Sequence, residues 1–452
     1  MNKIGLYTDR DFFAAARGVP EIHSLLDTDM YKFTMLDFII AHPEYRDVNV
    51  RREMNIRSKD IRTLDIIPRE ALEEQFTHCR TLKFTDVDLS FLRGMDNNHN
   101  TANGKRLLKE ETIDYLKNLQ LPAFTIGDDG KNYTLQFEGT WADSTLWEII
   151  GLKIINSLYL YYWTKKAHLS PTTFTEMISR TLVRLFDDIK IYNSIDNLTF
   201  SEFGTRRSMS SDFQRTIINI LMEQAPDQCL GTSNVLLSRE LGLSNPKGTN
   251  AHELRMIPTA LLDKPQDIID TMYDIDRQWM QHHPGLGILL ADTYGTSFYL
   301  NNCPQDIAMN HDGMRFDSKD PLIGIAEYNR FLQQHGRNPK SVIGIPSDGL
   351  SAKAVQDIMD VYGVSNNLTF GIGTSLTNNT KHTIVSDYGL GTPFGSFSVV
   401  IKPSQVQRDD GTRVSTVKLS DNPNKAMGSL ERVQFFKEIF GVEGMQQQET
   451  LV

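Results

Sequence analysis

From about residue 145 onward the chain alternates short apolar runs with amphipathic helical patterns. The runs are nearly continuous in apolar residues, as expected of strands covered on both faces, and lie at 198–204, 285–292, 312–318, 341–349 and 367–375. Helical patterns between them lie at 265–283, 321–336 and 351–363. Strand followed by helix, several times over, indicates parallel strands joined by crossover helices. The rhythm therefore predicts an α/β architecture, either a barrel or a doubly wound sheet.

Polar and glycine residues gather where these runs end, at 202–204, 292–293, 315–318, 347–349 and 371–374. In a (β/α) barrel the C-terminal ends of the strands meet at one active site. In an open sheet, strands far from the switch point have no reason to end in such residues. The pattern favours an α/β barrel over residues 146–395, with one site at the strand ends.

The two ends of the chain follow a different pattern. Residues 1–145 mix helical and strand-like pieces, including a strand at 133–139, and indicate an N-terminal α+β domain. The polar stretch 94–106 is interpreted as an insertion. Segment 396–452 combines a strand-like run with polar turns, and we expect it to pack back on the N-terminal domain.

The most hydrophobic stretch, 146–163, approaches the length of a membrane span but carries Glu148, Lys153 and Asn156. These polar residues favour a helix buried between layers over a membrane segment. The N-terminus is charged and lacks the apolar core of a signal peptide. We therefore expect a cytoplasmic protein that is not held by a membrane.

Charge and cysteine content exclude other classes. The net charge of −10 gives no overall basic field for nucleic acid, although it leaves room for a local basic site that binds an anionic small molecule. The cysteines are few and show no CxxC spacing, which argues against a disulfide framework and a structural zinc site. They are Cys79, Cys229 and Cys303.

A glycine-rich strand end at 370–375 is the clearest candidate for phosphate binding. Gly371 and Gly373 allow backbone N–H groups to approach an anion closely, and Thr374 adds a hydroxyl donor. Barrels often bind phosphate after their last strands. A plain glycine turn is the alternative interpretation.

Three carboxylates stand at other strand ends, namely Asp292, Asp317 and Asp348. Arg315 alternates with Asp317, so the two share a face of the strand, and a surface salt bridge is the alternative to a functional role. Carboxylates beside a phosphate loop indicate Mg²⁺ with a polyphosphorylated sugar.

An aromatic residue and two arginines follow the first strand. Phe203 could stack on a flat ring, and Arg206 and Arg207 could bind a carboxylate or phosphate. A core phenylalanine and two solvated arginines are the alternative. His252, in a polar segment after a glycine turn, could act as a nucleophile toward phosphate or as a base.

These pieces together resemble the nicotinate phosphoribosyltransferases, a branch of the type II phosphoribosyltransferases. The specific blocks are EFGTRRS, GTNAHE and FGIGT. Supporting blocks, in family order, include LLDTDMYKFTM, MNIRSKD, GTSNV, ADTYGT, RFDS, SDGL and VKLSDNP. The resemblance covers roughly residues 22–425. Lys319 departs from it, because the family often has glycine there.

The resemblance implies an irregular α/β barrel and an additional α+β domain built from both chain ends. It implies a homodimer with shared active sites. The reaction it implies joins nicotinate to phosphoribosyl pyrophosphate with Mg²⁺, giving nicotinate mononucleotide and pyrophosphate on a salvage route to NAD. ATP hydrolysis would be coupled to it through transient phosphorylation of a histidine, which gives a ligase-type classification.

Carried over by position, the resemblance implies three groups of residues. The catalytic ones are His252, which would be phosphorylated, Asp292 and Asp317, the last also a metal ligand. Those near nicotinate are Tyr31, expected from the partner subunit, Phe203, Arg206, Arg207 and Ser233. Those near the phosphoribosyl or pyrophosphate groups are Arg57, Arg315, Asp348, Gly349, Gly371, Gly373 and Thr374.

Two alternatives stay open at this point. In the related nicotinamide enzymes an Asp follows the Gly-Thr of the GTSNV block, where this chain has Ser233. An Asp there would repel a carboxylate, and repulsion of about 1–3 kcal/mol discriminates about tenfold or more. A non-catalytic sensor of NAD precursors is expected to have lost a catalytic residue, whereas His252, Asp292 and Asp317 are all present.

Overall fold

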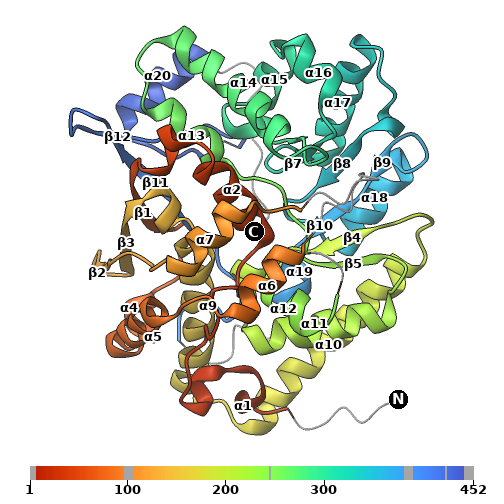
Figure 1. Ribbon diagram of the computed structural model, residues 1–452. Coiled ribbons are helices and arrows are strands. Elements are labelled where there is room, and N and C mark those ends of the chain that lie inside the picture. Colours follow the sequence, from red (N-terminus) through yellow and green to blue (C-terminus); the bar gives the residue numbers. More distant parts are fainter. Residues whose placement is uncertain (1–6, 96–105, 244–245, 381–389, 423–424, 442–452) are drawn as a thin grey trace.

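The computed structural model describes residues 7–95, 106–243, 246–380, 390–422 and 425–441 (Figure 1). Most of the predicted insertion, residues 96–105, lies outside these ranges. Among the described residues, no helix is both long enough and apolar enough to cross a membrane.

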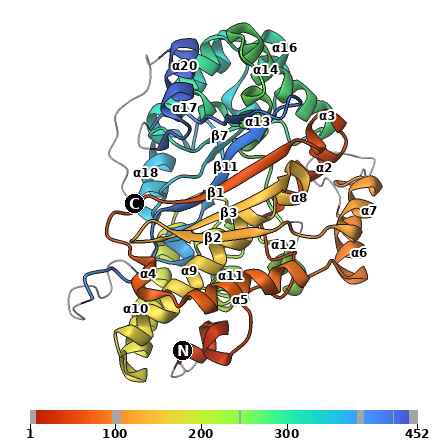
Figure 2. The same cartoon turned by 90° about the vertical axis from the view of Figure 1, so that its left-hand side faces the viewer.

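One antiparallel sheet joins the two ends of the chain. Its order is β12-β11-β1-β3-β2. The strands are β1 (Asn49–Ile56), β2 (Phe124–Asp128), β3 (Tyr133–Thr140), β11 (Val399–Gln407) and β12 (Arg413–Ser415). Figure 2 shows the blue β11 lying along the red β1, although about 350 residues separate them in sequence. The C-terminal segment thus completes a sheet that the N-terminal residues begin.

The barrel wall consists of two parallel sheets, ordered β10-β4-β5 and β6-β7-β8-β9. The strands are β4 (Phe200–Glu202), β5 (Cys229–Thr232), β6 (Ile288–Leu289), β7 (Gly313–Phe316), β8 (Ile343–Pro346), β9 (Asn367–Leu368) and β10 (Phe370–Ile372). The predicted run 367–375 divides at Thr369, whose N–H donates to Gly344 in β8, while the next residue, Phe370, donates to Thr199. This one segment therefore connects the two sheets.

An extended segment spans the gap between β5 and β6. The Lys247 N–H donates to the Thr232 carbonyl at 3.0 Å, and the Asn250 side chain donates to the Ile288 carbonyl at 3.4 Å. A side-chain contact at one edge replaces a full strand ladder, so the barrel closes irregularly. The predicted fold class, an irregular α/β barrel with an α+β domain from both chain ends, is confirmed.

The hydrophobic stretch 146–163 forms most of α9 (Trp147–Lys166), which is buried between the antiparallel sheet and the barrel. Its Trp147 ring stacks on Phe137 of β3, with centroids 4.8 Å apart. On the barrel side, its Asn156 donates to the Arg206 carbonyl at 3.0 Å. Its buried Lys153 is paired with Asp27 at 2.5 Å, which offsets the cost of burying that charge.

Three predicted helices are found at α14 (Pro265–His282), α17 (Pro321–Gln334) and α18 (Ala352–Tyr362). The run 285–292 gives only the two-residue β6, because the N–H of Gly287 donates to the Asp312 side chain instead of a strand. The other helices are α1 (Asp9–Phe12), η1 (Ala14–Arg17), α2 (Met30–Ile40), α3 (Pro43–Arg46), α4 (Thr63–Ile66), α5 (Arg69–Thr81), α6 (Asp86–Gly94), α7 (Glu110–Asn118), α8 (Trp141–Ser144), α10 (Pro171–Asn193), η2 (Thr205–Arg207), α11 (Ser211–Gln224), α12 (Val235–Glu240), α13 (Glu253–Ala260), η3 (Ala291–Thr293), α15 (Thr296–Asn301), α16 (Gln305–Asn310), η4 (Pro339–Ser341), α19 (Thr374–Thr377) and α20 (Leu430–Phe440).

Candidate active site

The polar residues at the strand ends lie at the same edge of the barrel wall. Phe203 follows β4, Asp292 follows β6, Asp317 follows β7, Asp348 follows β8 and Gly373 follows β10. Parallel strands bring their C-terminal ends to one side of a barrel, which places these residues around a common region. Contacts between their side chains and neighbouring loops define the candidate site.

His252 stands at the centre of this region, at the N-cap of α13. Its Nδ1 lies 3.0 Å from the Thr293 hydroxyl, and its Nε2 lies 3.0 Å from Asp317 Oδ2 and 2.7 Å from Lys418 Nζ. Nε2 cannot accept from Lys418 and donate to Asp317 at once, so the two contacts belong to different proton positions. When Lys418 donates, the proton lies on Nδ1 toward Thr293, and Nε2 carries the lone pair.

The environment keeps His252 neutral. Burial, reinforced by the charge of Lys418, lowers the His252 pKa to about 4, and Asp292 and Asp317 oppose this only in part. A neutral imidazole is the nucleophilic form of histidine. The buried histidine is therefore ready to attack an electrophile such as a phosphoryl group.

The carboxylates around His252 are ionised. Burial would raise the Asp317 pKa, but Arg315, His252 and Lys418 together hold it well below its ordinary value. Burial likewise opposes ionisation of Asp292, yet His252 and Lys418 lower its pKa. The Ser318 hydroxyl donates to Asp292 Oδ2 at 2.5 Å.

One ligand atom from each of His252, Asp292 and Asp317 lies within 4.8 Å of the others, so the group could hold a metal ion. Asp292 Oδ1 is buried and accepts no hydrogen bond within the described part of the chain. A buried carboxylate oxygen without a donor is costly unless a cation approaches it. The two carboxylates, Asp292 and Asp317, therefore fit a divalent cation that prefers oxygen ligands.

Two lysines of the C-terminal segment complete the site, and sequence reasoning assigned no role to them. Lys418 contacts His252, while Lys425 Nζ donates to Asp348 Oδ2 at 2.5 Å and to the Asp317 carbonyl at 3.3 Å. Both lie in or just after the VKLSDNP block, so basic residues beside a family block were the available signal. Their pairing with barrel carboxylates depends on the long-range fold.

Arg57 joins the same region from the end of β1. Its N–H donates to the Ser398 carbonyl at 2.7 Å, and its guanidinium donates to the Lys425 carbonyl at 3.4 Å. Burial and the positive charge of Arg206 lower its pKa. Arg207 is also nearby, and burial together with Arg206 lowers its pKa to about 10. Such crowded cations are stabilised when a polyanion binds between them.

The aromatic and arginine residues predicted to bind a ring lie beside this cationic group. The Phe203 ring packs directly over Gly371, where any side chain would collide with it. Arg206 lies 3.8 Å from the buried Glu148 and within electrostatic range of Tyr31 in the same chain. Tyr31 lies in the first turn of α2 beside Gly248, where a Cβ would lie 2.7 Å from the Tyr31 backbone nitrogen. Tyr31 and Arg206 thus influence each other electrostatically within one chain, and the expected contribution of Tyr31 from a partner subunit stays a prediction.

Ser233 is buried, and its hydroxyl donates to Asp29 Oδ1 at 2.7 Å. Burial raises the Asp29 pKa, which marks a carboxyl group that is poorly solvated. The Ser233 hydroxyl hydrogen is therefore used within the chain. An Asp at position 233 would face Asp29 directly, so serine also avoids a clash of two buried carboxylates.

The remaining predicted residues are found near these groups. Arg315 Nη2 lies 3.7 Å from Asp317 Oδ1, and Gly349, in a left-handed conformation with φ of 62°, follows Asp348. Thr374 begins α19 directly after Gly373. Lys319 departs from the family pattern, but its amino group donates to Glu327 at 2.5 Å and to Ser297 at 2.9 Å. It therefore points to these residues and not to Asp317.

A buried charge network fixes the helix that carries His252. Glu253 contacts Arg52 of β1 at 2.5 Å, Lys32 of α2 at 3.1 Å and the Thr145 hydroxyl at 3.0 Å. Burial alone would raise the Glu253 pKa, but Arg52 and Lys32 outweigh it and hold the pKa at about 2. The network ties the first turn of α13 to the α+β domain.

A sequence model described as the nicotinate phosphoribosyltransferase (NAPRTase) family matches residues 198–444, and a model of the NAPRTase N-terminal domain matches residues 26–156. The chain belongs to the nicotinate phosphoribosyltransferase family. Its activity is accordingly phosphoribosyl transfer to nicotinate in NAD biosynthesis.

Solved structures agree with this assignment. A nicotinate phosphoribosyltransferase from Vibrio cholerae is 28% identical, with a TM-score of 0.79 and 96% of both chains covered. A putative nicotinate phosphoribosyltransferase from Saccharomyces cerevisiae is 27% identical, with a TM-score of 0.76, covering 93% of this chain and 99% of that one. A structure from Porphyromonas gingivalis, 24% identical with a TM-score of 0.78, covers 93% of this chain and 100% of that one and shares the fold.

Proposed function

We propose that this enzyme transfers phosphoribosyl from phosphoribosyl pyrophosphate to nicotinate and couples the transfer to ATP hydrolysis through a phosphorylated His252. The observation that carries the coupling is the neutral His252 imidazole, with Nε2 beside Lys418 and Asp317. Nε2 would form the bond to the γ-phosphorus of ATP as the bond to ADP breaks. Later hydrolysis of the N–P bond would release phosphate and restore the histidine.

In the transfer step, the ring nitrogen of nicotinate forms a bond to the anomeric carbon while the bond to pyrophosphate breaks. Electrons pass to the leaving pyrophosphate, where Arg57, Lys418 and Lys425 would stabilise the negative charge. Phe203 and Tyr31 would orient the nicotinate ring, and Arg206 would attract its carboxylate. The cationic groups at the strand ends support this assignment, because both substrates, nicotinate and phosphoribosyl pyrophosphate, are anions.

Mg²⁺ is the metal that the family resemblance implies. Asp292 and Asp317 would hold it, because both are ionised and Asp292 Oδ1 lacks a hydrogen-bond donor in the described structure. When bound, the ion would add positive charge against the pyrophosphate. A homodimer with shared active sites and a cytoplasmic location are parts of the same proposal.

Pyrophosphate release with phosphoribosyl pyrophosphate and Mg²⁺ tests the proposal, with nicotinate or nicotinamide and with or without ATP. We expect release with nicotinate, raised by ATP. Preference for nicotinamide would contradict the proposed substrate specificity but not the fold. Binding of nicotinate without any release would indicate a sensor instead of an enzyme.

We predict that Ser233→Asp lowers kcat/KM for nicotinate by about tenfold or more, because a second carboxylate beside Asp29 repels the nicotinate carboxylate. Steady-state kinetics with nicotinate and nicotinamide would measure the change. Ser233→Ala is the matched control, since it removes the hydrogen bond to Asp29 without adding charge. Nicotinate kinetics like those of the wild type in Ser233→Asp would show that position 233 does not select the acid.

A further inference from the structure

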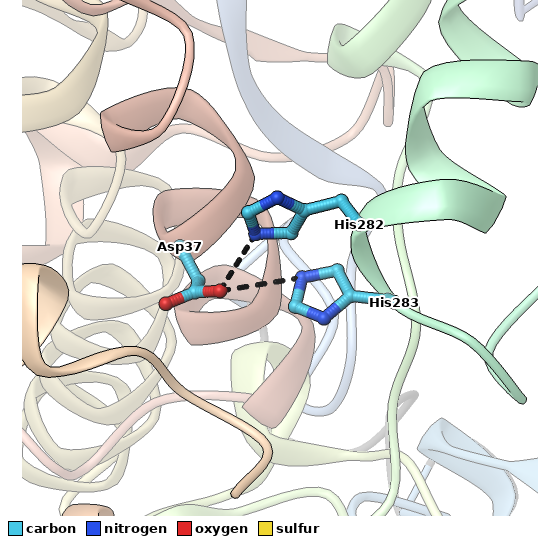
Figure 3. Close-up of side chains that lie close together, drawn as sticks. All are labelled: Asp37, His282 and His283. Atoms are coloured by element: carbon cyan, nitrogen blue, oxygen red, sulfur yellow. Dashed lines mark hydrogen bonds and ion pairs between the residues drawn. The ribbon is translucent and has the colours of Figure 1, made fainter. Parts of the chain in front are cut away.

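A second group of side chains suited to metal binding lies outside the candidate active site. Asp37 projects from α2, and His282 and His283 project from the end of α14 toward it (Figure 3). Asp37 Oδ2 lies 2.7 Å from His282 Nε2 and 3.9 Å from His283 Nε2. The three side chains are 1%, 5% and 3% exposed, so water competes little for their ligand atoms.

The surroundings hold the carboxylate so that one oxygen faces both histidines. Asp37 Oδ1 accepts hydrogen bonds from the Lys109 backbone N–H at 2.7 Å and from the Thr112 hydroxyl at 2.5 Å. Oδ2 is thereby directed to the two imidazoles. Supporting hydrogen bonds of this kind orient the ligands in protein metal sites.

Aromatic rings enclose the two histidines. The Phe38 ring lies edge-on to His282 with centroids 5.7 Å apart, and the Trp279 ring centroid lies 4.7 Å from that of His283. The His283 imidazole is therefore shielded from bulk water where it lies beside Asp37.

The ligand atoms lie near the spacing that a small tetrahedral ion requires, and small shifts would bring them to it. Ligands about 2.0–2.2 Å from a tetrahedral zinc ion lie about 3.3–3.6 Å from one another. The observed separations of 2.7 and 3.9 Å fall on either side of this range. His283 Nε2 donates to the Thr34 carbonyl at 2.9 Å, so its ring proton must move to Nδ1 before Nε2 can bind an ion. A water molecule could fill the fourth position.

We propose that Asp37, His282 and His283 bind a divalent transition-metal ion of the zinc class. Two imidazoles and one carboxylate suit Zn²⁺ or Co²⁺ and disfavour Mg²⁺ and Ca²⁺, which take oxygen ligands. The ion would link α2, whose first turn carries Tyr31, to the end of α14. The site is independent of the reaction proposed above.

Metal binding requires a change of proton position on His282. In the metal-free arrangement, Lys109 Nζ lies 2.9 Å from His282 Nδ1 and donates to it, which leaves the ring proton on Nε2 toward Asp37. An ion at Nε2 needs the proton on Nδ1 instead. Lys109 is exposed and must turn away, so its amino group competes with the metal.

Co²⁺ titration of the full chain, followed by the visible absorption of the bound ion, tests the proposal. We expect a bound Co²⁺ ion that Zn²⁺ displaces, with affinity reduced about tenfold or more in His283→Gln and in His282→Asn. Lys109→Met keeps all three ligands and should bind the ion several-fold more tightly. His252→Ala is the matched control, because it removes a histidine from the other metal-capable group, and it should bind as the wild type does.

Equal Co²⁺ affinity in the wild type, His283→Gln and His282→Asn would overturn the proposal. Loss of the ion in His252→Ala alone would also overturn it, because the ion would then lie in the active site. Pyrophosphate release in the absence of Co²⁺ and Zn²⁺ verifies that each ligand variant is folded. If His283→Gln does not fold, weaker or unchanged binding in Lys109→Met contradicts the proposal independently.

Discussion

His252→Ala is expected to abolish stimulation of turnover by ATP while slow ATP-independent turnover persists. The variant lacks Nε2, the nitrogen placed between Lys418 and Asp317, so no phosphoryl group can be held there. A phosphorylated histidine would add charge-assisted hydrogen bonds worth about 1.5–3 kcal/mol each, so the lost stimulation should be about tenfold to a hundredfold or more. Pyrophosphate release with and without ATP measures it.

Labelling provides a direct check on the same variant. ATP labelled at the γ-phosphate should transfer label to the wild type and leave His252→Ala unlabelled. Thr293→Val is a matched control, because it removes the partner of Nδ1 but retains the nucleophilic nitrogen, and it should still accept some label. ATP stimulation in His252→Ala equal to that of the wild type would exclude the phosphohistidine.

Glu253→Gln should destabilise the protein by about 3–5 kcal/mol, because it leaves Arg52 buried without its carboxylate partner and takes one of two carboxylates from Lys32. The midpoint of urea unfolding measures the change. Glu73→Gln is the matched control, since the Arg69–Glu73 pair is about half exposed and should change the free energy of unfolding by less than about 0.5 kcal/mol.

The pH dependence of this difference has a defined sign. Glu253 has a pKa of about 2 in the folded protein, below its ordinary value of 4.5. Its charge therefore stabilises the fold above about pH 4.5, and this contribution is lost as the pH falls toward 2. The difference in the free energy of unfolding between wild type and Glu253→Gln should therefore become smaller as the pH falls over that range. A gap that stays constant, or equal destabilisation by Glu73→Gln, would contradict the assigned role of the network.

The barrel could be predicted from sequence because its local patterns agree with its tertiary environment. The helices α14, α17 and α18 have strong apolar periodicity and clear starting or ending residues, so they form where the pattern places them. Run 285–292 yielded only a two-residue strand, since strand length depends on the partner strand and on Gly287, whose N–H is taken by Asp312. Strand β5 was missed because CLGT is short and has no distinctive pattern.

Some features of the candidate site could likewise be predicted from the sequence, and others could not. The sequence alone determined the strand-end residues, such as Asp292, Asp317 and Gly373, because a parallel fold brings strand ends together wherever they lie in the chain. It could not determine that Lys418 contacts His252, that Ser233 donates to Asp29, or that Asp37 meets His282 and His283. Those pairs are far apart in sequence, and each depends on how separate elements pack, so only the tertiary structure decided them.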